Sequence, residues 1–149
     1  MSLQEEVELL RRIPLFAKVE PPKLKLLAFA SERVTFEPGQ ELFHQGDMPD
    51  AAYIIIDGTA DVILDTPSGQ ITVATVGCNE SVGEMGIICD MPRTATVQAN
   101  SRLVTLKVSK DLFFRMIVDF PSMAIEIMRV MAHRLEHANA QLRTALAQH

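Results

Sequence analysis

The sequence predicts a mainly β protein, an antiparallel jelly-roll-like β-roll with helices on both sides of it in the chain. Short runs rich in β-branched residues recur between residues 33 and 108, and turn residues separate them. No long helical pattern interrupts these runs, which favours an antiparallel sandwich or barrel. A length of 149 residues suits one hydrophobic core. We therefore expect a single domain over 1–149.

Two short helices are expected in residues 1–32. Leu3, Val7 and Leu10 recur at helical spacing until Pro14 ends the run. A second apolar run follows Pro21, a residue that favours the first turn of a helix.

The β-roll is predicted for residues 33–108. Its strand-like segments are 34–36, 53–56, 60–64, 71–76, 94–97 and 103–106, and a further strand is expected to end at Val82. Pro38-Gly39 and Asp57-Gly58 are among the turns between them.

Residues 109–149 are expected to form a short helix capped by Ser109 and a long helix that follows Pro121. Apolar residues of the long helix alternate spacings of four and three in a heptad seam: Ala124, Met128, Met131, Leu135, Ala138, Leu142 and Ala145. This face could pack on the β-roll of its own chain. It continues past the length that one small barrel covers, so we favour a homodimer through Met128, Met131, Leu135 and Leu142.

Charge and composition exclude several classes of function. The chain has 14 basic and 19 acidic residues, a net charge of -5, and its basic residues form no cluster. Direct binding to DNA is not expected, because phosphate contacts need concentrated positive charge. Cys78 and Cys89 lack the spacing of a disulfide framework or a metal site. With no membrane segment and no signal-like N-terminus, a cytoplasmic protein is expected.

The segment from Val82 to Val97 interrupts the strand pattern. Gly83 permits a tight turn, one helical turn begins at Glu84, and a proline ends it just before Arg93. The start of a short helix offers unpaired N–H groups to an anion. An arginine can grip two phosphate oxygens at once.

Glu84 adds an acceptor beside this anion site. An ionised carboxylate binds a hydroxyl strongly, so a ligand that joins a phosphate to a ribose hydroxyl, a nucleotide, fits both groups. The alternatives are a helix-dipole role for Glu84 and a structural salt bridge from Arg93 to Glu84 or Asp90.

Residues 82–97 resemble the phosphate-binding cassette of cyclic-nucleotide-binding domains. This family includes bacterial catabolite activator proteins, regulatory subunits of cyclic-AMP-dependent kinase and cyclic-nucleotide-gated channels. Residues 36–39, 42–47 and 53–58 also resemble its glycine pattern, and the resemblance extends from Ile13 to the final helix.

The resemblance implies a role for individual residues. Gly83 would turn the backbone toward the ligand, Glu84 would accept the ribose 2′-hydroxyl, and Arg93 would pair with the cyclic phosphate. The amides of Met85 and Gly86 would complete the cradle. The remaining implied ligand-binding residues are Thr94 after the arginine, the apolar wall of Val62, Val73 and Val76, and Arg134 and Asn139 of the lid helix.

The sequence departs from the family pattern at three positions. Ala138 lacks the hydroxyl that bacterial activators use to contact adenine. Asn79 replaces a glycine, and Asn is the residue that best tolerates a positive φ after glycine. Ser81 replaces an apolar residue. Neither of the last two changes affects the phosphate chemistry.

These observations predict a regulatory binding module that couples cyclic AMP or cyclic GMP to the position of the last helix, with no cofactor and no enzymatic activity. Glu84 has neither a nucleophile nor a second carboxylate beside it in the cassette. The chain ends at His149 without a helix-turn-helix, so a free-standing sensor and a domain of a larger regulator both remain open. The alternatives are a dimerisation module with a silent pocket and a small β-barrel metalloenzyme that uses His133 and His137.

Overall fold

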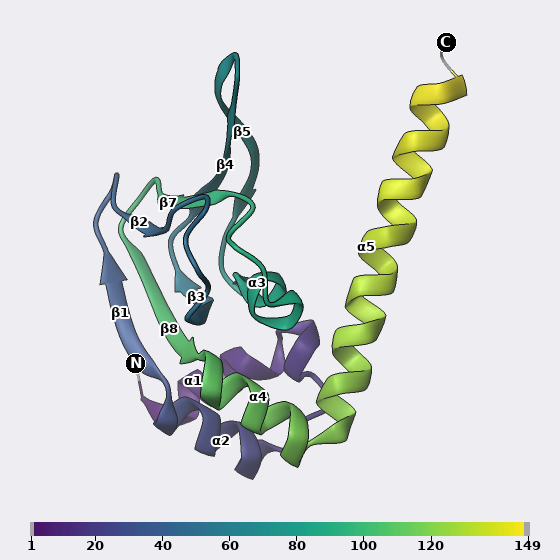
Figure 1. Ribbon diagram of the computed structural model, residues 1–149. Coiled ribbons are helices and arrows are strands. Elements are labelled where there is room, and N and C mark those ends of the chain that lie inside the picture. The colour runs from purple at the N-terminus through teal and green to yellow at the C-terminus, as the bar shows by residue number, and fades with distance from the viewer. Residues whose placement is uncertain (1, 148–149) are drawn as a thin grey trace.

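A computed structural model describes residues 2–147, so three terminal residues of the predicted domain lie outside it. It confirms the predicted fold class (Figure 1). The elements in chain order are α1 (Leu3–Arg11), the 3-10 helix η1 (Pro14–Phe16), α2 (Pro21–Ala30), β1 (Glu32–Phe36), β2 (Glu41–Phe43), β3 (Ala51–Asp57), β4 (Ala60–Thr66), β5 (Gly69–Val76), β6 (Ser81–Val82), α3 (Glu84–Cys89), β7 (Thr96–Ala99), β8 (Leu103–Ser109), α4 (Lys110–Asp119) and α5 (Pro121–Ala147).

Within residues 2–147, the strands form two four-stranded antiparallel sheets in the orders β1-β8-β3-β6 and β2-β7-β4-β5. The sequence did not predict β2, which has only three residues. The strand expected at 94–97 is β7 and begins at Thr96, because the main chain of Arg93 bonds instead to the turn after β2. Thr94 and Ala95 are thereby left outside the sheet.

Strand β3 is buried on both faces because its alternate side chains enter two different cores. Tyr53 and Ile55 belong to the core between the sheets. Ile54 and Ile56 belong to a second core, where the helices cover the outer face of the sheet. Figure 1 shows these helices gathered at one end of the roll.

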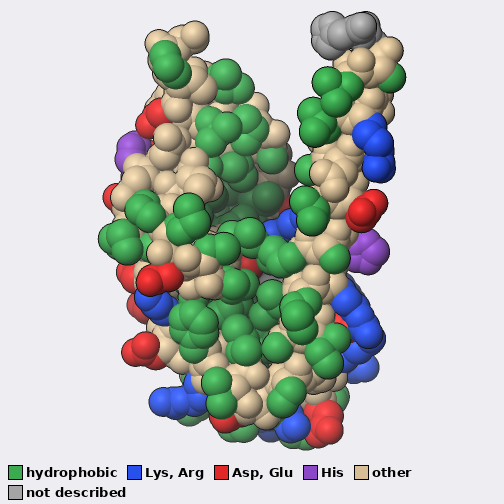
Figure 2. All heavy atoms as spheres, turned by 45° about the vertical axis from the view of Figure 1, so that its right-hand side comes forward, with side chains coloured by type: hydrophobic (Ala, Val, Ile, Leu, Met, Phe, Trp, Pro, Cys, Tyr) green, Lys and Arg blue, Asp and Glu red, His purple; other side chains and the backbone are tan. Residues whose placement is uncertain are grey.

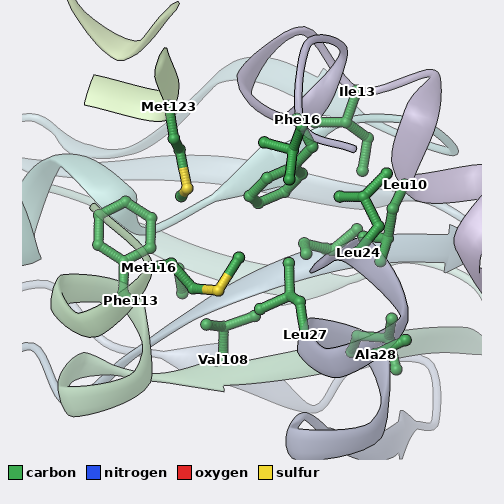
Figure 3. Close-up of a cluster of buried hydrophobic side chains, with 14 of the residues drawn as sticks. Leu10, Ile13, Phe16, Leu24, Leu27, Ala28, Val108, Phe113, Met116 and Met123 are labelled. Carbon is green, nitrogen blue, oxygen red and sulfur yellow. The ribbon is translucent and has the colours of Figure 1, made fainter. Parts of the chain in front are cut away.

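The helical core unites both ends of the chain (Figure 3). Phe16 and Leu27 from the N-terminal helices and Phe113 and Met123 from the C-terminal ones are almost completely buried in one cluster. The predicted cap of α4 is confirmed, because the Ser109 hydroxyl accepts a hydrogen bond from the Leu112 amide at 3.2 Å.

The long helix α5 is anchored at its base. Met123 and Ile127 are buried, and the Glu126 carboxylate lies 3.0 Å from the Lys18 ammonium. Its hydrogen bond with Lys18, reinforced by Arg129, lowers the pKa of Glu126 below its ordinary value. The first turns of α5 are therefore held by both apolar and charged contacts.

Farther along, α5 leaves the helical core and extends beside the β4–β5 hairpin (Figure 1). Along the predicted seam, Met128, Leu135 and Leu142 are 61%, 62% and 57% exposed. Met131 is partly buried and packs against the helical core. Most of the seam thus stays open in the single chain. No helix within residues 2–147 is long and apolar enough to cross a membrane.

Candidate functional site

A cavity of about 400 Å³ lies between the β-roll and α5. Its walls come from β2, the β4–β5 pair, α3, the segment that follows α3, and α5. Figure 2 shows this region as a hollow with apolar side chains on the facing surfaces of the roll and α5.

Most of the predicted site residues meet at this cavity. It is lined by Gly83, Glu84, Met85, Gly86, Arg93, Thr94, Val62, Val76 and Arg134. Val73 and Asn139 are not among the lining residues within 2–147. Val73 occupies a bulge, since Val62 pairs with Ala74 and the next residue of β4 already pairs with Thr72. Asn139 is exposed on the part of α5 that extends beyond the helical core.

Residues with positive φ lie on both sides of α3, and Asp90 ends the helix with a φ of +51°. Asn79 has a φ of +72°, so the predicted tolerance of asparagine for this conformation is confirmed. Gly83 precedes the helix with a φ of +88°. A Cβ on Gly83 would lie 2.8 Å from Arg93 Nη1 and 3.0 Å from Phe43 Cε2. Gly83 is therefore needed both for its backbone conformation and for the close approach of these two side chains.

The Arg93 side chain is only 5% exposed and is held by the backbone. Its Nη1 donates to the Gly83 carbonyl at 2.6 Å, and its Nη2 donates to the Ala51 carbonyl. The guanidinium lies over the Phe43 ring, with Cζ 3.9 Å from the ring centroid. Burial lowers the pKa of Arg93, with nearby Asp50 opposing the shift, but a guanidinium stays charged at neutral pH.

The main chain of Arg93 is fixed by the turn that follows β2. The Gly46 amide donates to the Arg93 carbonyl at 2.8 Å, and the Arg93 amide donates to the Asp47 carbonyl at 2.7 Å. The end of β2 and the turn after it therefore position the arginine. The turn holds its backbone, and Phe43 contacts its side chain.

Glu84 is the first residue of α3 and is 2% exposed. Its Oε1 accepts a hydrogen bond at 3.0 Å from Nη2 of Arg134, whose side chain is half exposed on α5. The suggested structural salt bridge from Arg93 is wrong, because Glu84 pairs with Arg134 and Asp90 pairs with Lys110 at 3.4 Å.

Two buried polar atoms of residues that line the cavity lack a hydrogen-bond partner within residues 2–147, Oε2 of Glu84 and Nε of Arg93. Leaving such atoms unpaired costs about 1–3 kcal/mol each, and more where the group is charged. A ligand with a hydroxyl donor and an anionic acceptor would satisfy both.

Two contributors to this arrangement could not be predicted from the sequence. Phe43 was noted only as part of a glycine-containing pattern, and no spacing rule indicates that its ring stacks on Arg93. The Ala51 carbonyl belongs to the backbone and has no side-chain signature at all.

The histidines of the metalloenzyme alternative, His133 and His137, lie exposed on α5. Across the described residues, no three His, Cys, Asp or Glu side chains are grouped so that they could hold a metal ion.

Comparison with known proteins identifies the family. The family model of the cyclic nucleotide-binding domain matches residues 33–119, more than half of the chain. This chain belongs to the cyclic nucleotide-binding domain family. Family and fold are those of regulatory binding domains.

Individual relatives match large parts of the chain. The N-terminal domain of a transcriptional regulator from Streptomyces coelicolor A3(2) has 31% sequence identity and a TM-score of 0.73, over 89% of this chain and 95% of that one. The CRP-like cAMP-activated global transcriptional regulator of Mycobacterium tuberculosis is 29% identical over 136 residues, 91% of this chain and 61% of the regulator.

A third relative, lysophospholipase nte1 of Aspergillus oryzae, is 34% identical over 116 residues. The match covers 76% of this chain and 8% of the lysophospholipase. The chain thus spans 61% of the length of the M. tuberculosis regulator and 8% of the length of the lysophospholipase.

We expect replacement of Gly83 to disturb the arginine. In Gly83→Ala the new Cβ would displace the guanidinium, so affinity for cyclic nucleotides should fall about tenfold or more, the equivalent of one lost charge-assisted hydrogen bond. Isothermal titration calorimetry measures the change.

Gly39→Ala is the matched control. Gly39 has a φ of +92° and nothing within 4 Å of an added Cβ, so it shares the backbone strain without the collision. Each variant should lose about 1–2 kcal/mol of stability from the left-handed conformation. Equal nucleotide affinity in the two variants would contradict the role assigned to Gly83.

Proposed function

We propose that this chain is a cytoplasmic sensor module that binds a cyclic nucleotide and converts its occupancy into a change in α5. Cyclic AMP is the first candidate ligand and cyclic GMP the second. The observation that supports this best is that Glu84 and Arg93 line one cavity and that each has a buried polar atom, Oε2 and Nε, without a partner among the described residues. A cyclic nucleotide supplies the matching donor and acceptor in one rigid molecule.

In the proposed complex the cyclic phosphate contacts Arg93 and the amides of Met85 and Gly86. The ribose 2′-hydroxyl donates to Glu84, and Val62 and Val76 provide an apolar surface for the base. A buried guanidinium already screened from water binds an anion more strongly than an exposed one, because the local dielectric is lower. The module binds its ligand without transforming it.

The choice of cyclic AMP rests on the M. tuberculosis relative, whose name describes a cAMP-activated regulator. Thr94 lines the cavity and can bond either a phosphate oxygen or the amino group of guanine, so it is compatible with both purines.

Coupling to α5 is supported by the ion pair between Glu84 and Arg134. The carboxylate that would receive the ribose hydroxyl also holds the lid helix, so the ligand and α5 share one acceptor. A ligand shifts a conformational equilibrium only if it interacts differently with the two states. A ribose hydroxyl on Oε2 would weaken the ion pair that Oε1 makes with Arg134, and this provides that difference in interaction free energy.

We further propose that two copies associate through the open seam of α5. Met128, Leu135 and Leu142 recur at heptad spacing and are more than half exposed. Exposed apolar residues in such a stripe favour a coiled coil, which would bury them. The net charge of -5 disfavours direct contact with DNA, so regulation would pass through the paired helices to another domain or protein.

The ligand assignment predicts a thermal shift. At about 100 times its dissociation constant, a cyclic nucleotide adds about 2.7 kcal/mol, which raises the Tm by roughly 5–10 °C for a chain of this length. Differential scanning fluorimetry with cyclic AMP, cyclic GMP and the linear 5′-monophosphates would identify the ligand. Arg93→Leu should remove the shift, because it deletes the charged partner of the phosphate.

No shift with either cyclic nucleotide, in protein shown to carry no nucleotide from purification, would favour the dimerisation module with a silent pocket. An undiminished shift in Arg93→Leu would contradict the phosphate site.

The coupling predicts a response in α5. Hydrogen–deuterium exchange of the amides in 128–142 should change when the nucleotide binds. In Arg134→Gln the amides of α3 should still become protected while the response of α5 is lost. Unchanged exchange of α5 in the wild-type complex would contradict the coupling.

If two copies pair through the seam, a substitution within it should change the molecular mass of the protein in solution. Leu135→Glu places charges opposite each other in the paired seam, so light scattering should give a dimer for the wild type and a monomer for the variant. Val118→Glu, at an exposed apolar position of α4 outside the seam, is the control and should remain a dimer. A wild-type monomer at high concentration would refute this part of the proposal.

A further inference from the structure

We infer that Phe43 is a positioning residue for the anion site: its ring fixes the plane of the Arg93 guanidinium at the cavity wall. This inference rests on the proposed function, since the positioned group is the one assigned to the phosphate. It assigns an aromatic residue of β2 to a site otherwise formed by α3 and the segment after it.

Phe43 contacts the guanidinium directly. The guanidinium carbon lies 3.9 Å from the centroid of the Phe43 ring, well within the range of a cation–π interaction. The charged group is buried, so it has lost most of its water and the attraction to the ring face is stronger than at an exposed site.

The other contacts of the guanidinium leave its orientation incompletely fixed. Nη1 and Nη2 donate to the carbonyls of Gly83 and Ala51, which anchor one edge of the guanidinium. Two bonds along one edge permit the plane to tilt about that edge. The Phe43 ring, packed against Cζ, restricts this tilt.

The Phe43 ring is itself held in place by its neighbours. Phe43 pairs with Val97 across the sheet, and its ring centroid lies 6.2 Å from that of Tyr53. Tyr53 in turn contacts the Phe36 ring edge-on at 5.9 Å. The turn that begins after Phe43 also bonds to the main chain of Arg93. The Phe43 ring and the Arg93 backbone are thus both held by β2 and the turn that follows it.

Fluorinated phenylalanines test the inference, because they weaken the negative ring face while changing its shape very little. Incorporation of mono-, di- and trifluorophenylalanine at position 43 should raise the Kd for the cyclic nucleotide stepwise, by about three- to thirtyfold in total. The same series at Phe36, which contacts Tyr53, is the matched control and should leave the Kd unchanged. A purely structural role for Phe43 would produce no graded series.

A second measurement on the ligand-free protein separates failure of this inference from failure of the proposed function. The ¹⁵N signal and hydrogen exchange of the Arg93 Nε–H group report directly on the order of the guanidinium. Exchange should accelerate along the series at position 43 and stay constant along the series at position 36. If the wild type bound no cyclic nucleotide, the proposed function would fail while this graded exchange would still support the positioning role.

An unchanged Kd and unchanged Nε–H exchange along the series at position 43 would overturn the inference. Phe43→Leu provides an independent check, because it keeps an apolar side chain in the core and removes the ring. It should weaken nucleotide binding at least as much as the trifluoro derivative.

Discussion

The buried guanidinium of Arg93 is the constraint on which the site depends. A charge removed from water must be compensated by nearby polar groups, or its burial would cost several kcal/mol. Here the compensation comes from three segments that are distant in sequence: the Ala51 carbonyl at the start of β3, the Gly83 carbonyl before α3, and the Phe43 ring at the end of β2. None of the three can move without leaving part of the charge uncompensated. The arginine therefore organises the cavity wall as well as contributing a charge to it.

The same constraint links the stability of the fold to the geometry of the site. Strand β3 supplies one of the carbonyls, and its alternate side chains form part of both hydrophobic cores. A change that loosens either core would be expected to shift the start of β3, and with it an acceptor of the arginine. The cores of this protein thus also act as the rigid support that a preorganised binding site requires.

The sequence predicted the features that depend on local pattern, and it could not predict those that depend on contacts between distant segments. Alternating β-branched runs indicated the β-roll, and Ser109 indicated the start of α4, because both signals are local. The Gly83, Glu84 and Arg93 set was found from residue type and spacing. The stacking of Phe43 and the role of the Ala51 carbonyl arise only after the strands pair. Val73, which the family resemblance implied for the apolar wall, is not among the residues that line the cavity, because a bulge in β5 shifts the register by one residue and no local pattern reveals that bulge.

The relation between the site and α5 follows from the two oxygens of Glu84. One oxygen binds Arg134 of α5, and the other has no partner among residues 2–147. In the proposed complex a ribose hydroxyl on the second oxygen draws electron density from the carboxylate and weakens its attraction for the arginine. Because Arg134 also lines the cavity, the anionic phosphate of the proposed complex would offer it a second negative partner. Both effects would act on α5 through the charge of Arg134. The base of α5 is held separately by Met123, Ile127 and the pair of Glu126 with Lys18, so the response would be confined to the helix beyond that anchor.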